Sequence, residues 1–355
     1  MKTKLVKVDR KNIDAYSIME AGGVLLAGGL VGIPTETVYG LAANALDKKG
    51  AAKTYKVKGR PSDNPLIVHI AKMEDLDKII KNKPKKAELL AEKFWPGPLT
   101  MIFEKSSLVP YETTGGLDFV AVRMPKDKIA LAIIEAGGGY ISAPSANKSG
   151  RPSPTTANHV LEDLGGEIEM IIDGGSVEIG LESTVVDMTC DPPAILRPGI
   201  ITKEMIEDII GAVNNGKLNL SDDSEEKPKA PGMKYKHYAP KGELYIVLGD
   251  AKEAILAIKK EVKATLAEGK KVGVITTDEA IHEYKQEIAK SVGTRSDIYT
   301  IAANLYKVLR EFDDEGAELI YSESFPIDGI GWAIMNRLDK AAGYSYIKVD
   351  EIVEP

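Results

Sequence analysis

The sequence predicts a two-domain α/β protein, with a large mixed, twisted sheet flanked by helices in its N-terminal domain and a smaller open α/β domain after it. First, a chain of 355 residues is longer than a domain with a single hydrophobic core usually is. Second, helix-type and strand-type patterns alternate along it. Third, residues 214–242 carry an acidic run, three prolines and almost no aliphatic side chains. We therefore expect domains at residues 1–211 and 243–355, joined by a linker at 212–242.

In the N-terminal domain, apolar residues with helical spacing alternate with short apolar runs. Helices are expected at residues 13–27, 47–57, 128–136, 155–164 and 203–210, and over 73–94 with a break at Pro84. Strands are expected at residues 30–34, 66–70, 99–104, 119–123, 140–143, 170–173, 184–188 and 194–197. Because strands outnumber helices, a mixed sheet with helices packed on it is favoured over a purely parallel one.

The second domain has the βαβ rhythm of a Rossmann-like fold. Strands are expected at residues 244–248, 272–275 and 317–321, and helices at 253–266, 278–289, 301–310 and 332–342. Its candidate loop, Val272-Gly-Val-Ile275, has only one glycine, so we assign it no dinucleotide. The end of the linker, residues 231–240, alternates aromatic and cationic side chains, which a simple tether does not need, so we expect this segment to dock.

Composition excludes several classes of protein. The net charge of −7 argues against binding nucleic acid by overall charge, so any anion site must be a local basic pocket. Cys190 is the single cysteine and there are four histidines, which excludes a disulfide framework and argues against a Cys/His zinc site. We find neither a signal-peptide pattern nor an 18-residue apolar run, and expect a soluble cytoplasmic protein with no membrane partner.

The segment Lys58-Gly-Arg60 places two cations two residues apart. Pro61 favours an extended conformation for Arg60, and in extended chain Lys58 and Arg60 would project to the same side. Two such cations suit a polyphosphate, since arginine contacts oxygens bidentately and lysine acts as a point charge. The alternative is a solvated surface loop whose charges serve solubility.

Two other polar segments lie near strand ends. Ser145, Asn147 and Ser153 lie in a proline-stiffened loop that would form a nest of donors for phosphate or ribose, or else a turn before a helix N-cap. Thr35 follows a buried strand, where open α/β folds place ligands; an N-cap is the alternative. His69 lies inside an apolar strand, where it could be a buried histidine whose hydrogen bonds are made within the core and which binds no ligand. We find neither a Gly-x-Ser-x-Gly elbow nor a Walker loop, so the residues alone indicate an anion-binding cleft and no hydrolytic site.

The order of these segments resembles one family. Lys58-Gly-Arg60 followed by Ser145-Ala-Asn147 is similar to the Lys-x-Arg…Ser-x-Asn signature of the YrdC-type threonylcarbamoyl-AMP synthases. The linker and the C-terminal segment "GIGWAIMNRLDKAAG" resemble the long, two-domain version. The matching N-terminal blocks, in chain order, are "GIPTETVYGLAANA", "KGRPSDNPLIVHI", "FWPGPLTMIF", "VAVRMP", "SAPSANKSGRPSPT", "ESTVVDM" and "ILRPG".

The resemblance implies an enzyme that condenses L-threonine, bicarbonate and ATP into L-threonylcarbamoyl-AMP and pyrophosphate. A separate tRNA threonylcarbamoyl transferase complex would then modify tRNAs that read ANN codons, without strong direct tRNA binding by this chain. A carbamate oxygen attacks the α-phosphorus, so the reaction asks for positioning and charge neutralisation rather than an enzyme nucleophile. This agrees with the lack of a hydrolytic triad in the sequence.

By the same resemblance, Lys58 and Arg60 neutralise the triphosphate together with Mg²⁺, and Arg123 meets the threonine carboxylate. For Arg123, a strand-end ion pair remains the alternative. Tyr235 and His237 are expected to close over the nucleotide as a lid. The residues expected to bind the phosphates, ribose or adenine of ATP are Ser62, Ser145, Asn147, Ser153 and Arg197. Those expected to bind threonine are Thr35, His69 and Ser183.

Two rival functions remain. An RNA-binding protein would use the same basic cleft, but it needs a broad basic stripe or stacking aromatics, and aromatic residues make up 6% of the chain. A carbamoyl-transferring maturation factor contains the same domain, yet such relatives carry zinc-finger-like cysteine motifs that a chain with only Cys190 cannot supply.

Overall fold

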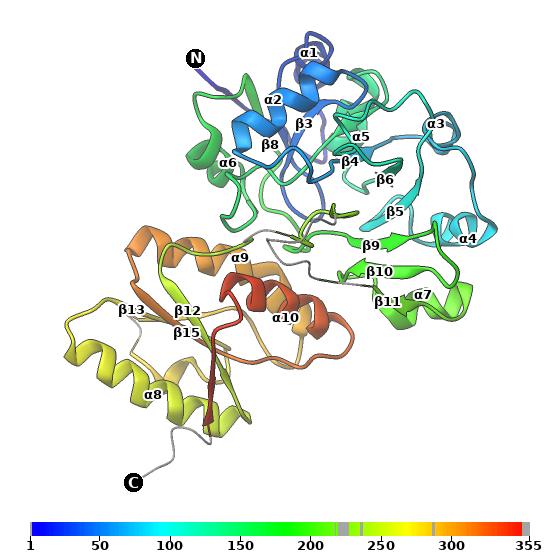
Figure 1. Ribbon diagram of the computed structural model, residues 1–355. Coiled ribbons are helices and arrows are strands. Elements are labelled where there is room, and N and C mark those ends of the chain that lie inside the picture. The colour runs from blue at the N-terminus through cyan, green and yellow to red at the C-terminus, as the bar shows by residue number, and fades with distance from the viewer. Residues whose placement is uncertain (1, 217, 219–226, 235–236, 286–287, 350–355) are drawn as a thin grey trace. The chain divides into compact units, whose positions relative to one another are not determined.

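The computed structural model describes residues 2–216, 218, 227–234, 237–285 and 288–349 (Figure 1). They divide into two compact units. The first contains the described residues up to 234 except for two short loops. The second contains the described residues from 237 onward together with those loops, Gly150–Pro152 and Ile179–Leu181. No helix in the described part of the chain is long and apolar enough to span a membrane.

The first unit is built on one mixed sheet of eleven strands in the order β1-β8-β2-β3-β7-β4-β6-β5-β9-β10-β11. The strands are β1 Lys4–Lys7, β2 Val31–Ile33, β3 Gly40–Asn44, β4 Ile67–His69, β5 Leu99–Glu104, β6 Phe119–Arg123, β7 Ile141–Ser142, β8 Met170–Asp173, β9 Thr184–Asp187, β10 Ala194–Arg197 and β11 Asn214–Asn215. The helices are α1 Ala15–Leu26, α2 Lys48–Lys58, α3 Met73–Ile79, α4 Lys85–Phe94, α5 Lys128–Ala136, α6 Ala157–Leu164 and α7 Lys203–Ile210.

Helices cover both faces of this sheet. Val31 and Ile33 of β2 lie in a core cluster with residues of α1 and α5. Leu41 and Ala43 of β3 lie in a second cluster with residues of α2 and α6. Ala42, between these two, belongs to the first cluster, as expected from the alternation of side chains along a strand. The two clusters therefore lie on opposite faces of the sheet.

Aspartate and threonine side chains fix where several helices begin. Asp14, Asp47 and Asp127 accept backbone N–H groups at the N-termini of α1, α2 and α5, and Thr156 and Thr202 do the same for α6 and α7. Such caps satisfy N–H groups that lack a partner within the helix.

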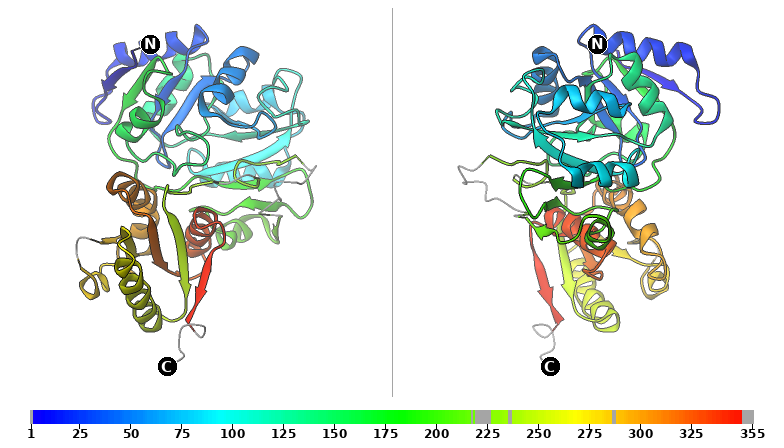
Figure 2. Two further views of the ribbon diagram at one scale, coloured as in Figure 1. Left: turned by 60° about the vertical axis from the view of Figure 1, so that its left-hand side comes forward. Right: turned by 90° about the vertical axis from the view of Figure 1, so that its right-hand side faces the viewer.

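The second unit is a parallel sheet in the order β14-β13-β15-β12-β16. Helix α8 contacts β12, β13 and β15, and α9 packs on α10. In both views of Figure 2, the red strand β16 lies beside the yellow-green β12. Its elements are β12 Glu243–Leu248, α8 Ala251–Ala267, β13 Val272–Thr276, a short 3-10 helix Ile281–Glu283, β14 Ala289–Ser291, α9 Ile298–Glu315, β15 Leu319–Glu323, α10 Ile330–Ala341 and β16 Tyr346–Lys348.

These two sheets confirm the predicted fold class, while one predicted helix, residues 278–289, is wrong. Among the described residues of this range, 278–285 and 288–289, only Ile281–Glu283 is helical, as a single 3-10 turn, and Ala289 opens the edge strand β14. The Glu279 carboxylate accepts the Thr294 hydroxyl and the backbone N–H of Arg295, which ties it to a loop 15 and 16 residues away. These tertiary contacts and the pairing with β13 override local helix propensity.

The described linker residues 227–234 pack on the first unit. Ala230 is fully buried and Met233 is 6% exposed, in a cluster with strand residues that include Ile102 and Val185. The Lys229 ammonium donates to Asp187 Oδ2 at 3.0 Å. Residues 227–234 therefore pack on this sheet; the predicted docking of the whole segment 231–240 is not tested, because residues 235–236 lie outside the described residues.

The contact of α1 with α5 provides a test of this packing. A Cβ at Gly22 would lie 2.6 Å from the Cβ and carbonyl oxygen of Ala136, whereas one at the neighbouring Gly23 meets nothing within 4 Å. We expect Gly22→Ala to lower the free energy of unfolding by about 1–3 kcal/mol through overpacking. The matched Gly23→Ala should raise it by roughly 0.5–1 kcal/mol, because alanine favours a helix interior. Urea denaturation measures both, and equal effects would contradict this packing.

Candidate active site

Lys58 and Arg60 lie at the end of α2, not in one extended segment as the sequence predicts. Lys58 is the last helical residue, and Gly59 ends the helix in the left-handed conformation with φ of 62°. This turn replaces the extended chain expected before Pro61. Both side chains are also buried, Lys58 at 2% and Arg60 at 8% exposure, which corrects the alternative of a solvated loop.

Backbone oxygens hold both cations. Lys58 Nζ donates to the carbonyl oxygens of Ser145 at 2.5 Å and Asn147 at 2.6 Å. Arg60 Nη2 donates to Asn64 Oδ1 at 2.6 Å, and its Nε to the Asn64 carbonyl at 3.1 Å. The backbone N–H of Ser149 in turn donates to the Lys58 carbonyl. The structure thus joins the Lys-x-Arg segment to the Ser145–Asn147 loop, which lies 87 residues away in sequence.

Arg123, the last residue of β6, forms a buried ion pair. Its Nη2 donates to Glu36 Oε1 at 2.7 Å, with both side chains 5% exposed. Its Nη1 donates to Thr37 Oγ1 at 2.9 Å, and its Nε to the Gly97 carbonyl at 3.3 Å. The ion pair that the sequence left as an alternative is therefore present. Because guanidinium has five N–H donors, these three bonds to described residues leave two that no other described residue accepts.

Thr35 and His69 lie close to this pair. Thr35 Oγ1 lies 2.8 Å from Thr37 Oγ1, so it is one hydroxyl away from Arg123. His69 is the register partner of Arg123 in the adjacent parallel strand β4. Burial first, and the Arg123 guanidinium second, lower the pKa of His69 to about 3. A neutral imidazole therefore faces the site at physiological pH, with Nδ1 lying 3.2 Å from the Ile67 carbonyl.

Ser183, directly before β9, and Arg197, the last residue of β10, form a second buried group. Arg197 Nη2 donates to Ser183 Oγ at 3.1 Å, and its Nε to the Ser183 carbonyl at 3.0 Å. Ser183 Oγ also lies 2.8 Å from Thr100 Oγ1, and Thr100 is the antiparallel partner of Arg123. The Ser183 hydroxyl thus connects Arg197, the arginine expected to hold the nucleotide, with Thr100 on β5, the strand next to the one that carries Arg123.

The other predicted residues are dispersed. Ser145 is half-buried beside Lys58, whereas Ser62 is exposed on the loop that follows α2. Ser153 is fully buried and its hydroxyl donates to Glu182 Oε1 at 2.5 Å. His237 is half-buried in the second unit, where its ring lies 5.4 Å from that of Tyr238. Tyr235 lies outside the described residues.

Two residues of the hydrogen-bond network around Arg123 were not predicted from the sequence. Thr37 and Thr100 supply hydroxyls to Arg123 and Ser183. The motif Thr35-Glu-Thr37 has the signal, since alternating hydroxyl and carboxylate groups at a strand end suit an arginine, but its partner 86 residues away cannot be read from spacing. For Thr100, inside an apolar strand, we find no such signal.

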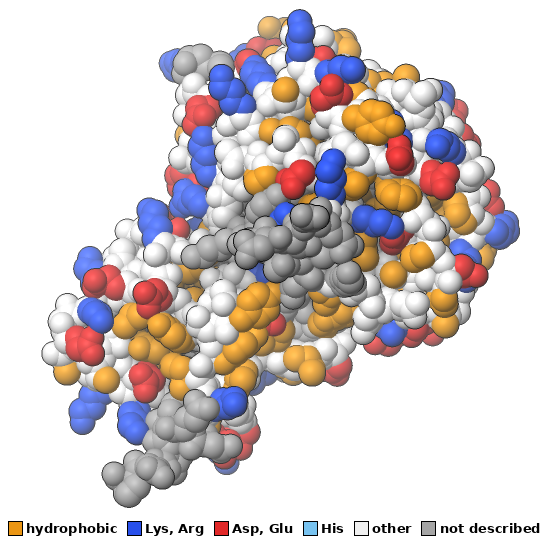
Figure 3. Space-filling view, in the orientation of Figure 1, with side chains coloured by type: hydrophobic (Ala, Val, Ile, Leu, Met, Phe, Trp, Pro, Cys, Tyr) orange, Lys and Arg blue, Asp and Glu red, His pale blue; other side chains and the backbone are white. Residues whose placement is uncertain are grey.

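Charges on the visible surface do not favour a polyanion partner. On the face seen in Figure 3, described Lys and Arg side chains are interspersed with Asp and Glu rather than gathered into a broad basic stripe. A nucleic-acid backbone held electrostatically requires such a stripe. This face gives the RNA-binding alternative no support.

Comparisons with known proteins agree with the resemblance seen in the sequence. The Sua5/YciO/YrdC family model, described as "Telomere recombination", matches residues 23–199, and that described as "Threonylcarbamoyl-AMP synthase, C-terminal domain" matches residues 201–343. The chain is 48% identical to a threonylcarbamoyl-AMP synthase of Pyrococcus abyssi over 96% of this chain and 98% of that one. It is 47% identical to the Bacillus subtilis protein of the same name, over 98% and 100%. A crystal structure of P. abyssi Sua5 complexed with L-threonine aligns with a TM-score of 0.91 at 47% identity, over 98% and 99% of the two chains.

The lowered pKa of His69 makes a prediction about stability. An unfolded histidine titrates near 6.5, so below that pH the unfolded state binds a proton that the folded state refuses. Stability is complete above about pH 6.5 and falls toward pH 3, by at most about 1.4 kcal/mol per pH unit. Between pH 7 and pH 5, His69→Gln should lose up to about 2 kcal/mol less than the wild type.

Denaturant unfolding at several pH values measures this difference. The control is His282→Gln, since the His282 side chain is 72% exposed. If the His69→Gln and wild-type curves fall in parallel, His69 does not exclude its proton in the folded protein.

Proposed function

Because this chain belongs to the family of threonylcarbamoyl-AMP synthases, we propose that the buried cations of its first unit are the catalytic apparatus of that reaction. The enzyme condenses L-threonine, bicarbonate and ATP into L-threonylcarbamoyl-AMP, pyrophosphate and water. The product supplies threonylcarbamoyladenosine in tRNAs that read ANN codons. The observation that carries the assignment of roles is Lys58, an ammonium group buried at a loop of Ser145 and Asn147.

The reaction requires the negative charge of the triphosphate and of the leaving pyrophosphate to be neutralised. The threonine amine and bicarbonate give a carbamate and water, and a carbamate oxygen then attacks the α-phosphorus while pyrophosphate leaves. In phosphoryl-transfer chemistry of this kind, catalysis rests on positioning and electrostatic stabilisation. Lys58 and Arg60 meet the triphosphate, where their charges oppose the negative charge that develops on the leaving pyrophosphate. Their burial strengthens this effect, because Coulomb interactions are stronger where water is excluded.

Threonine binds at the Arg123 network in this proposal. The two spare N–H donors of Arg123 take its carboxylate, and Glu36 holds the guanidinium in place through Nη2. Thr35, His69 and Ser183 line the position of the amine and hydroxyl. A neutral His69 suits this role, because a second positive charge there would repel the ammonium form of threonine.

ATP binds beside threonine. We assign five residues to its phosphates, ribose or adenine: Ser62, Ser145, Asn147, Ser153 and Arg197. Mg²⁺ arrives on the triphosphate, and in the described part of the chain no three His, Cys, Asp or Glu side chains cluster to hold a metal. Tyr235 and His237 close over the nucleotide, which would keep water from the labile product.

We also propose which partner receives the product and in which compartment the reaction takes place. The product passes to a tRNA threonylcarbamoyl transferase complex, and this chain itself makes no strong contact with tRNA. The interspersed surface charges support this division of labour. We place the reaction in the cytoplasm, as the scarcity of cysteine predicts.

Pyrophosphate release tests the proposed function. With ATP, Mg²⁺, L-threonine and bicarbonate, the purified protein should release pyrophosphate, and omission of either threonine or bicarbonate should abolish it. Lys58→Met removes the buried charge while keeping most of the side-chain volume, and we expect at least a hundredfold loss of kcat/KM. The control is Lys56→Met, an exposed lysine on the same helix. Release that continues without threonine would identify a different nucleotide-cleaving enzyme.

A further inference from the structure

A chain of hydrogen bonds connects the Arg123 guanidinium with the backbone of the loop between β2 and β3. The loop carries Thr35 and Thr37, which are 2% and 0% exposed. Arg123 Nη1 donates to Thr37 Oγ1 at 2.9 Å, and Thr37 Oγ1 lies 2.8 Å from Thr35 Oγ1. The Thr35 hydroxyl in turn donates to the carbonyl oxygen of Val38 at 2.7 Å.

The protons in this chain point in one direction. A hydroxyl group has one proton to donate, and Thr35 gives its proton to the Val38 carbonyl. The bond between the two hydroxyls must therefore use the proton of Thr37. In the reverse direction the Thr37 proton would face the guanidinium, which accepts no hydrogen bond. Thr37 thus accepts from Arg123 and donates to Thr35, and each proton has an acceptor.

The backbone fixes the end of the chain that lies away from Arg123. Thr35 Oγ1 also accepts the backbone N–H groups of Thr37 at 3.1 Å and of Val38 at 3.3 Å. Turns of this kind, in which a hydroxyl bonds to the backbone a few residues on, are typical of serine and threonine. The Thr35 hydroxyl is thus fully engaged in the loop, and it fixes the position of the Thr37 hydroxyl.

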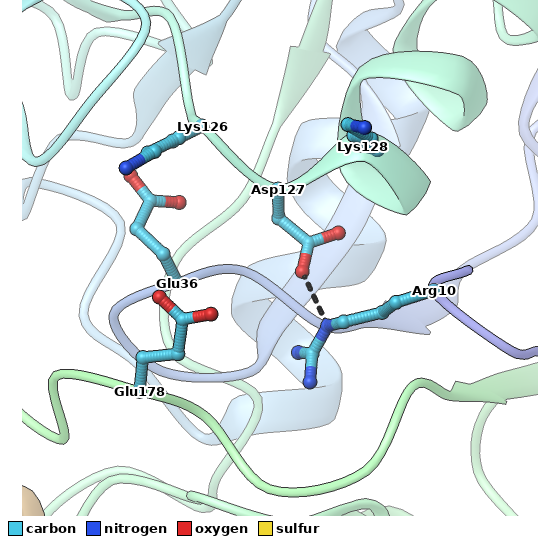
Figure 4. Close-up of a pocket in the computed structure, with 6 residues that line it drawn as sticks. All are labelled: Arg10, Glu36, Lys126, Asp127, Lys128 and Glu178. Atoms are coloured by element: carbon cyan, nitrogen blue, oxygen red, sulfur yellow. Dashed lines mark hydrogen bonds and ion pairs between the residues drawn. The ribbon is translucent and has the colours of Figure 1, made fainter.

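The two other groups that accept from Arg123 hold it less firmly. The bond from Nε to the Gly97 carbonyl is long, at 3.3 Å. Glu36 accepts through Oε1 at 2.7 Å, but its Oε2 has no donor among the described residues. As Figure 4 shows, Glu36 also lines a pocket with other charged side chains, three of them basic and two acidic. They are Arg10, Lys126, Asp127, Lys128 and Glu178.

The charges around this pocket act on Glu36 as well, whereas the Thr37 hydroxyl has no exposed surface and makes both of its bonds within the chain described above. Thr37 is therefore the acceptor whose direction is set by the backbone alone.

We propose that Thr37 is a positioning residue for L-threonine, which sets the orientation of the Arg123 guanidinium through this chain of hydrogen bonds. The inference rests on the proposed function, in which Arg123 meets the threonine carboxylate. A guanidinium binds a carboxylate best through two parallel N–H bonds, so the orientation of its plane decides the affinity. Thr37 accepts from Nη1 and Glu36 from Nη2, and together they keep the plane from turning.

Calorimetric titration with L-threonine tests this role. Thr37→Val nearly keeps the size of the side chain but removes both hydrogen bonds of the hydroxyl, and we expect it to raise the Kd for L-threonine about tenfold. Thr37→Ser keeps the hydroxyl and should stay within about twofold of the wild type. The Kd for ATP should be unchanged in both variants.

The control is Thr54→Val. Thr54 is also fully buried, but its hydroxyl donates to the Gly50 carbonyl within α2 and has no bond to Arg123. This variant should bind L-threonine like the wild type.

A double-mutant cycle separates positioning from general damage to the fold. Arg123→Met removes the group through which Thr37 acts, so adding Thr37→Val to it should raise the Kd for L-threonine no further. In steady-state assays, Thr37→Val should raise the KM for threonine and leave kcat at saturating threonine unchanged, because Thr37 does not touch the reacting atoms. Thermal unfolding of each variant shows whether the fold is retained.

Any one of three results overturns the proposal. The first is an unchanged Kd for L-threonine in Thr37→Val, and the second is an equal loss of affinity in Thr37→Ser. The third is a further loss when Thr37→Val is added to Arg123→Met. A failure of the proposed function gives a different result: the wild type would bind no L-threonine, or Arg123→Met would bind it as well as the wild type does.

Discussion

The need to keep cations buried without water governs the architecture of the first unit. Lys58, Arg60, Arg123 and Arg197 are each at most 8% exposed, and a buried charge is tolerated only where polar groups surround it. The loops at the strand and helix ends supply those groups: the carbonyls of Ser145, Asn147 and Ser183, the Asn64 side chain, and Glu36. Loops distant in sequence are drawn together because each satisfies a cation on another. A cation held in this way is already dehydrated and positioned when an anionic substrate arrives, which is the preorganisation that phosphoryl transfer requires.

The arrangement also separates the roles of the charges. Lys58 and Arg60 donate hydrogen bonds to backbone carbonyl oxygens and to the amide oxygen of the Asn64 side chain. Arg123 instead receives the carboxylate of Glu36, which neutralises part of its charge and fixes its orientation. The first pair suits a highly charged triphosphate, and the second suits a single carboxylate on a zwitterion.

Sequence patterns predicted the layers of the fold better than its edges and its side-chain partners. Long apolar strands such as Leu99–Glu104 and capped helices such as Lys203–Ile210 have strong local signals, and they appear as expected. The strand Gly40–Asn44 was missed, because glycine and alanine have little β propensity and it is pairing with two neighbours that makes it a strand. The helix expected at 278–289 failed because contacts of Glu279 with a later loop prevailed. In the candidate site, residue types predict an anion site, which stays a prediction, and they did not show that Lys58 ends a helix. A lysine followed by a glycine carries that signal, because glycine commonly ends a helix, and in this structure it prevails over the preference of Pro61 for an extended residue before it.

The most direct test of the account is calorimetric titration of the wild type, Lys58→Met and Arg123→Met with ATP and, separately, with L-threonine. If the two cations serve different anions, Lys58→Met weakens only ATP binding and Arg123→Met weakens only threonine binding, each by about tenfold or more. Thermal unfolding of both variants shows whether the fold is retained. Equal losses for both ligands in both variants, with the fold intact, would contradict the assignment of separate phosphate and carboxylate sites.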